Sequence, residues 1–182
     1  MKKKILIASA IGLNFIILGL VLWQVSNKPR FAYVDLPGVY DNFQMKKQLE
    51  SKLDNVGSQR KSILDSLEIK LKTLASTIDH GMSASQKHKD SLYSAYENLR
   101  QEYALKSQNF TEDNERTKQQ YNEQIWKQLN QYIKDYGHDN GYAFIFGADG
   151  SGSLMYGNDP QNITDAIKEY VNKRFAGEKV SL

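Results

Sequence analysis

A long stretch without proline, residues 41–136, constrains the fold of this chain more than any other feature. A run of this length without proline predicts helix. In its first half, apolar residues recur mostly three and four positions apart, which is the pattern of a coiled-coil seam. The pattern stops at residues 79–85, where Gly81 suits a helix C-terminus and Ser83 or Ser85 suits the next N-cap. We therefore predict two long helices that fold back on each other at residues 79–85.

This predicted hairpin is a thin arm that cannot bury a globular core. A helix rises about 1.5 Å per residue, so the arm should be roughly 60–75 Å long. Arg60 interrupts the apolar pattern of the first helix, and residues 111–120 of the second helix are almost all polar. Because few apolar contacts resist local opening there, we predict that residues 111–120 are weakly packed.

Outside the arm, three short runs of the chain predict strands. They lie at residues 31–35, 142–146 and 153–156, and turn residues bound each of them. The glycine-rich residues 147–152 separate the last two runs, which predicts a β-hairpin with a loop longer than the tightest type. An amphipathic helix that ends near Phe175 follows.

Together these elements predict an α+β protein, in which a long antiparallel helical hairpin stands on a small β-rich oligomerisation body. The predicted parts are an N-terminal membrane segment at residues 1–27, a body at residues 31–40 and 137–176 that includes the C-terminal helix, and an arm at residues 41–136. Because a small domain buries a small share of its surface, a body of this size is marginal as an independent core.

Near the N-terminus, three lysines precede an apolar run without charge at residues 5–23. Lysines ahead of such a run keep the N-terminus in the cytoplasm and direct the rest of the chain across the membrane. The run is about long enough to span a bilayer, and residues 24–29 make a poor cleavage site. We therefore predict an uncleaved signal anchor. A cleaved signal peptide is the alternative, and under both the functional part lies outside the cytoplasmic membrane.

Both faces of the predicted strand at residues 142–146 are apolar. Side chains alternate along a strand, so Tyr142, Phe144 and Phe146 should share one face while Ile145 lies on the other. Apolar faces need a cover. One short helix covers a single face, so we expect a second copy of the chain to cover the other. The expected oligomer core consists of Tyr33, Val34, Tyr142, Phe144, Ile145, Phe146, Leu154 and Tyr156.

Four short motifs surround the predicted hairpin: FAYVD at residues 31–35, GYAFIF at 141–146, LMY at 154–156 and NITDAI at 162–167. In this order, around a hairpin of this length, they resemble the Skp-type, OmpH-like periplasmic chaperones. The resemblance implies a homotrimer whose three arms enclose a cavity. In that cavity the family holds unfolded outer-membrane proteins without ATP. Family members usually carry a cleaved signal peptide and basic arms, so the anchor-like N-terminus and nearly neutral arm of this chain are departures.

The sequence contains no motif that predicts catalysis or nucleic-acid binding. Cysteine is absent, and none of the three histidines lies in a metal-binding pattern. Residues 147–152 lack the lysine that a phosphate-binding loop needs, so a glycine turn is predicted there. The net charge of +3 comes from basic residues near the N-terminus and makes no clustered footprint for nucleic acid. We predict no enzyme activity, no cofactor and no metal.

The function predicted from the sequence is that of an ATP-independent holdase chaperone on the periplasmic side of the inner membrane. A structural coiled-coil scaffold of an envelope complex is the alternative, because it also requires long helices and oligomers. Apolar and aromatic side chains near the arm tip are candidate client contacts, since they offer apolar area with little loss of side-chain entropy. They are Ile78, Met82 and Tyr93.

Overall fold

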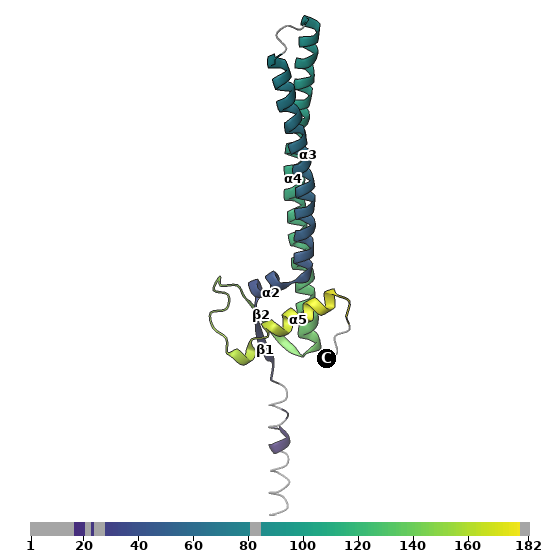
Figure 1. Ribbon diagram of the computed structural model, residues 1–182. Coiled ribbons are helices and arrows are strands. Elements are labelled where there is room, and N and C mark those ends of the chain that lie inside the picture. Colours follow the sequence, from purple (N-terminus) through teal and green to yellow (C-terminus); the bar gives the residue numbers. More distant parts are fainter. Residues whose placement is uncertain (1–16, 21–22, 24–27, 81–84, 179–182) are drawn as a thin grey trace, which may run out of the picture.

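A computed structural model of the chain describes residues 17–20, 23, 28–80 and 85–178. Figure 1 shows a long two-helix arm that rises from a small body. In chain order the elements are β1 (Arg30–Asp35), α2 (Leu36–Asn42), α3 (Gln44–His80), α4 (Gln86–Asp139), β2 (Tyr142–Ala148), the 3-10 helix η1 (Asp159–Gln161) and α5 (Thr164–Phe175). The arm consists of α3 and the part of α4 that faces it, and the other elements form the body with the last turns of α4.

The arm confirms the predicted pair of long antiparallel helices. α3 ends at His80 and α4 begins after Ser85, whose extended backbone makes it the N-cap, so the described helix ends fit a tip within residues 79–85. Helical structure begins earlier than predicted, in α2 at Leu36. The reason is that Pro37 fits the first turn of a helix, where the missing N–H has no intrahelical partner.

The body contains a sheet of two parallel strands, β1 and β2. The predicted hairpin between residues 142–146 and 153–156 is wrong, because residues 153–156 form no strand and β2 pairs with β1 instead. A parallel pair needs a long crossover connection, and here the arm supplies it. α4 returns the chain to the end of the body where β1 starts, so β2 runs in the same direction as β1 (Figure 1).

The core of the body lies between β1, α2, α5 and the lower part of α4. Its fully buried large side chains are Phe43, Ile125, Leu129, Ile167, Val34, Val39 and Val171. The predicted C-terminal helix is confirmed as α5, and it covers the core face of the sheet. The body is less β-rich than the sequence suggested, because helices contribute most of its buried residues.

α5 also fixes the point where the arm leaves the body. The helix breaks at Phe43, between α2 and α3, and the Phe43 ring packs edge-on against Tyr132 and Phe175 at 6.3 and 5.7 Å. Asn172 of α5 accepts a hydrogen bond from the Gln44 N–H (2.8 Å) and donates one to the Asn42 carbonyl (3.2 Å). These bonds join α5 to both sides of the break and tie the arm to the body.

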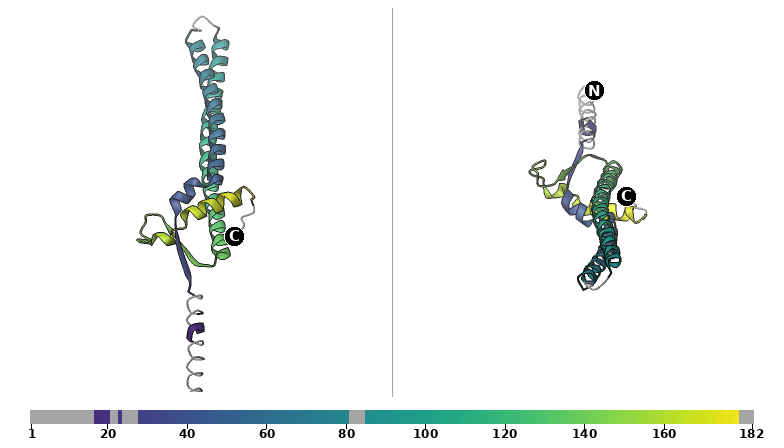
Figure 2. Two further views of the ribbon diagram at one scale, coloured as in Figure 1. Left: turned by 60° about the horizontal axis from the view of Figure 1, so that its bottom comes forward. Right: turned by 90° about the horizontal axis from the view of Figure 1, so that it is seen from above.

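Most of the predicted membrane anchor at residues 5–23 lies outside the described residues, so the anchor remains a prediction. Within the part of the chain that the structure describes, no helix is both long enough and apolar enough to cross a membrane. β1 begins at the end of the body opposite to the arm, as the left view of Figure 2 shows.

Candidate functional site

The outer face of the sheet carries three exposed aromatic rings, which we call the aromatic face. Phe31, Phe144 and Phe146 are 44%, 59% and 46% exposed. The ring of Phe144 stacks on Phe31 at 6.0 Å and 7°, and on Phe146 at 6.0 Å and 20°. An exposed apolar patch of this kind marks an interaction surface. Phe31 was not among the residues predicted from the sequence, although its position two residues before Tyr33 places both on one face of β1.

Three residues of the predicted oligomer core contact the protomer's own core, and the oligomer core itself stays a prediction. Val34 is 1% exposed, and Ile145 lies opposite Ala32 on the inner face of the sheet. Tyr142 departs from the expected alternation, because the strand pairing is irregular next to Arg30, and its ring stacks on Tyr136 at 6.1 Å. These three side chains pack against the protomer's core on the inner side of the sheet. Phe144 and Phe146 remain available to a partner.

A loop at residues 149–158 projects from the body beside β2 (Figure 1). Tyr156 is 79% exposed and Met155 is 87% exposed, while Leu154 is half-buried. Tyr33 reaches this loop from the sheet, where its hydroxyl donates to the carbonyl of Gly157 (3.4 Å). Met155 is a further exposed apolar residue, and it was not predicted from the sequence.

The glycine-rich turn in the same loop is held by a local hydrogen-bond pattern. Asp149 accepts hydrogen bonds from the backbone N–H and the hydroxyl of Ser151, at 2.9 and 2.6 Å. These bonds lower the pKa of the Asp149 carboxyl, with the hydroxyl of Ser151 as the main cause. Within the described residues, no group of three or more histidine and acidic side chains could hold a metal ion. The turn is an ordinary Asx turn.

Of the candidate client contacts, Tyr93 is 56% exposed on the outer arm and Ile78 is half-buried in the seam. Met82 lies outside the described residues. Two further apolar side chains on the arm, Ile69 and Leu105, are more exposed than Tyr93. Neither was predicted from the sequence, because isolated apolar residues between seam positions carry no periodic signal.

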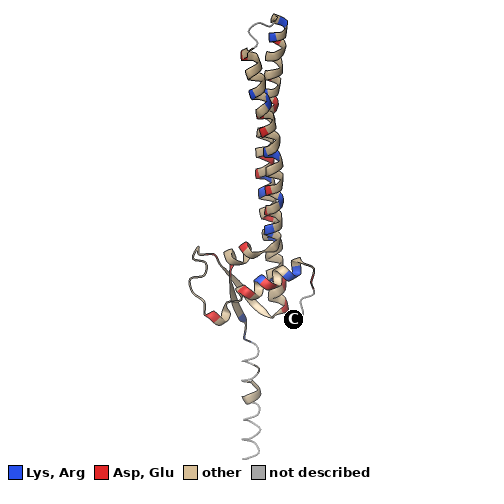
Figure 3. Ribbon diagram, viewed as in Figure 1, with Lys and Arg blue, Asp and Glu red and all other residues tan. Residues whose placement is uncertain are grey.

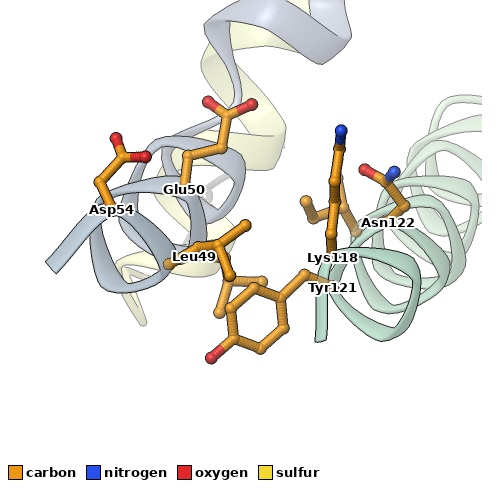
Figure 4. Close-up of a pocket in the computed structure, with 8 residues that line it drawn as sticks. Leu49, Glu50, Asp54, Lys118, Tyr121 and Asn122 are labelled. Atoms are coloured by element: carbon orange, nitrogen blue, oxygen red, sulfur yellow. The ribbon is translucent and has the colours of Figure 1, made fainter. Parts of the chain in front are cut away.

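Near the base of the arm, α3 and α4 enclose a hollow of about 440 Å³, which we call the interhelical hollow (Figure 4). Its lining residues are Leu49, Glu50, Leu53, Asp54, Lys118, Tyr121, Asn122 and Ile125. The aliphatic and aromatic members form the floor. Glu50 and Asp54 stand on the α3 wall, and Lys118 and Asn122 stand on the α4 wall.

Tyr40 of α2 holds one wall of this hollow in place. Its hydroxyl donates to Oδ1 of Asn122 (3.0 Å), and its ring stacks on Trp126 at 4.8 Å and 19°. The Lys46 ammonium lies 5.2 Å from the centre of the same ring and forms ion pairs with Asp41 (3.1 Å) and with the neighbouring Glu50. Burial raises the pKa of Tyr40, so its hydroxyl stays protonated and remains a donor.

Further along the arm, Arg60 takes the place of an apolar seam residue. Its guanidinium pairs with Asp113 (3.2 Å), donates to the Phe110 carbonyl (3.4 Å) and to the side-chain oxygen of Asn114, and lies 5.3 Å from the Phe110 ring centre. One turn before Arg60, a Cβ atom at Gly57 would meet no atom of another helix or of a non-adjacent side chain within 4 Å. The seam is therefore polar and incompletely filled between the hollow and the outer arm.

Charges of both signs alternate along the arm, as Figure 3 shows. Many of them pair within one helix, for example Lys61 with Asp65 at 2.6 Å and Lys72 with Glu68 at 2.6 Å. These hydrogen-bonded pairs raise the pKa of each lysine. The arm presents no extended field of one sign, and this agrees with the nearly neutral balance read from the sequence.

Comparison with known proteins identifies the family. A family model described as outer membrane protein (OmpH-like) matches residues 30–171, so this chain belongs to the OmpH-like family. Among solved structures, it is similar to the crystal structure of an OmpH-like protein from Caulobacter crescentus, described as a candidate outer membrane chaperone. That similarity has a TM-score of 0.70 at 16% identity and covers 85% of this chain and 89% of the other. It shows a shared fold. No curated protein matches the chain.

Proposed function

We propose that this protein is an ATP-independent periplasmic chaperone that holds unfolded outer-membrane proteins between the helical arms of a homotrimer. Two features together carry the proposal. The body has an exposed aromatic face through which copies of the chain can associate, and the two-helix arm is too thin to enclose a client by itself. Family membership and the likeness to the Caulobacter crescentus structure support a chaperone role. The count of three follows the resemblance to the Skp-type family.

The aromatic face is the natural contact between protomers. Aromatic residues are enriched in protein interfaces, where they bury large apolar areas. Phe31, Phe144 and Phe146 stack into a continuous surface, and α5 covers only the opposite face of the sheet. The exposed side chains of Met155 and Tyr156 lie on the adjacent loop and extend the surface available to a partner. Tyr33 and Leu154, both half-buried, complete the proposed contact.

Clients are held by many weak contacts along the inside of the arms. Scattered apolar side chains, such as Tyr93, Ile69 and Leu105, provide such contacts without forming one strong site. Weak distributed binding lets an unfolded chain rearrange while it is shielded, and it requires no energy source. Because charges of both signs alternate along the arm (Figure 3), capture by a general electrostatic field is a minor part of this mechanism.

The proposed location is the periplasmic side of the inner membrane, with residues 5–23 as an uncleaved anchor. β1 begins at the end of the body away from the arm (Figure 1). An anchor that leads into β1 therefore lets the arms extend away from the bilayer, into the space that an unfolded outer-membrane protein crosses. Intact mass of the protein from membranes tests the anchor, and a mass that lacks residues 1 to about 26 would establish the secreted form.

The direct test of the function offers the protein an unfolded client. A chain lacking residues 1–27 is mixed with a urea-denatured β-barrel protein, and light scattering follows aggregation after dilution of the urea. We expect suppression at a stoichiometry of one trimer per client and no dependence on ATP. An oligomer that never protects any unfolded protein would instead favour the structural scaffold of an envelope complex.

A further inference from the structure

The interhelical hollow at the arm base has the features of a built binding site. We propose that it takes one apolar side chain, aromatic or leucine-like, of an extended client segment, while the rim of the hollow binds the peptide groups on either side of that side chain. This inference rests on the proposed chaperone function and adds a defined contact to it.

The floor of the hollow is apolar and is not filled by the protein itself. Leu49, Leu53, Tyr121 and Ile125 line it, and the volume of about 440 Å³ falls in the range of ordinary ligand pockets, about 300–1,000 Å³. Leu53 and Tyr121 are only half-buried, so both keep apolar surface that a ligand can cover. Covering that surface removes it from water, and this drives binding of an apolar side chain.

The rim of the hollow matches the hydrogen-bonding groups of a peptide. Each peptide unit offers one N–H donor and one C=O acceptor. Glu50 and Asp54 place acceptors on the α3 wall, and Lys118 and Asn122 place donors on the α4 wall (Figure 4). An extended segment that crosses the hollow can therefore direct N–H groups to one wall and C=O groups to the other.

The polar group of Asn122 is oriented before a client arrives. Its Oδ1 already accepts from Tyr40, so the amide nitrogen is the group left to donate. Tyr40 is held in turn by its stack on Trp126. A site fixed in this way binds with a smaller entropic cost than one that must form on binding.

The charges on the rim argue for a peptide rather than for a small ion. The carboxylate of Glu50 and the ammonium of Lys118 stand on opposite walls (Figure 4), and Lys46 neutralises part of the charge of Glu50. Opposite charges across the hollow largely cancel, so neither an anion nor a cation gains from the site as a whole. A neutral peptide with an apolar side chain is complementary to both walls and to the floor.

The test uses the full-length protein in lipid nanodiscs, with isotope-labelled leucine and isoleucine methyl groups. The probe is the capped peptide N-acetyl-Ala-Phe-Ala-amide, and the control peptide carries serine in place of phenylalanine. We expect saturable shifts of the methyl signals of Leu49, Leu53 and Ile125 with the phenylalanine peptide, and none at Leu67 farther out in the seam. Equal shifts with the serine peptide, or no shifts near the hollow, would overturn the proposal.

Two variants of residues that line the hollow test the floor and the rim separately. Leu53→Trp fills the hollow and should abolish the shifts at Leu49 and Ile125. Asn122→Asp keeps the acceptor for Tyr40 and replaces the free donor by an acceptor, which should weaken binding roughly fivefold to tenfold. If Leu53→Trp loses its helical circular dichroism, Asn122→Asp and the serine peptide decide the question. Unchanged binding in Asn122→Asp would contradict the proposed rim.

The same variants separate this inference from the proposed function. If the wild type suppresses aggregation of a denatured β-barrel and Leu53→Trp suppresses it equally well, the hollow is not a client site while the chaperone function stands. If the wild type binds the phenylalanine peptide in the hollow but protects no client, the binding site stands and the chaperone function fails. The expected result is binding by the wild type and weaker protection by Leu53→Trp.

Discussion

The base of the arm and its middle are built from the same two helices, but different interactions hold them together. At the base, Phe43, Ile125 and Leu129 are fully buried, and Asn172 of α5 bonds to both sides of the break before α3. In the middle, a polar cluster around Arg60 replaces the apolar seam. Beyond the break at Phe43, α3 and α4 run unbroken through both stretches, so the contrast lies in the packing between these two helices.

This difference indicates which part of the arm can open or rearrange locally. Apolar side chains packed to high density leave a core few alternative arrangements. Polar groups near water can exchange one partner for another at small net cost, because ion pairs that are not fully buried contribute little stability. The arm should therefore be rigid where it leaves the body and looser around Arg60. Under the proposed function, such a contrast would let the arms keep one geometry at the body while they accommodate clients of different sizes.

The largest expected effect comes from a cavity made at the base. Leu129→Ala removes a fully buried side chain and should lower the free energy of unfolding by about 2–5 kcal/mol. Ile63→Ala, an exposed position in the middle of the arm, should cost less than about 1 kcal/mol. Urea denaturation followed by circular dichroism measures both changes. Similar losses at the two positions would remove the contrast between base and middle.

Amide hydrogen exchange tests the same contrast without a substitution. Residues 111–120 include Asp113 and Asn114, which bond to Arg60 in the polar part of the seam, whereas residues 129–133 pack against the body core. We expect residues 111–120 to exchange roughly 100-fold faster than residues 129–133, because local opening there breaks few apolar contacts. Uniform protection along α4 would show that the middle is as firmly packed as the base.

The smallest effect should be a gain of stability in the middle of the arm. Gly57→Ala adds a methyl group where no atom lies within 4 Å and removes the flexibility of glycine in a helix, so it should stabilise by about 0.5–1 kcal/mol. The neighbouring exposed change Gln59→Ala should leave stability nearly unchanged. A loss of stability in Gly57→Ala would mean that the open space at this position is needed.

The sequence predicted the long helices, the strands at residues 31–35 and 142–146 and the C-terminal helix, because each has a clear local pattern. It did not predict the pairing of the strands. Residues 153–156 have the composition of a strand and follow β2 closely, which favoured a hairpin. The direction of the strands depends on where α4 ends, and that is a tertiary property with no local signal.

The candidate site was predicted in part. Alternation along β2 correctly separated Phe144 and Phe146 from Ile145, but it did not reveal which face is covered by α5. Ile145 proved to pack inside the protomer. The interhelical hollow was not predicted at all. It depends on how α3 and α4 are placed relative to each other and on seam side chains that leave space between the two helices.

The most direct test of the account asks whether assembly through the aromatic face is required for protection of clients. Phe144→Asp places a carboxylate in the proposed contact without entering the protomer core, and burying it unpaired would be costly. Leu105→Asp, exposed on the arm, is the matched control for assembly.

Multi-angle light scattering and suppression of β-barrel aggregation are measured on both variants, each lacking residues 1–27. We expect Phe144→Asp to be a monomer with intact helical circular dichroism and no protection, while Leu105→Asp remains a trimer. A Phe144→Asp monomer that protects clients as well as the wild type would contradict enclosure by assembled arms.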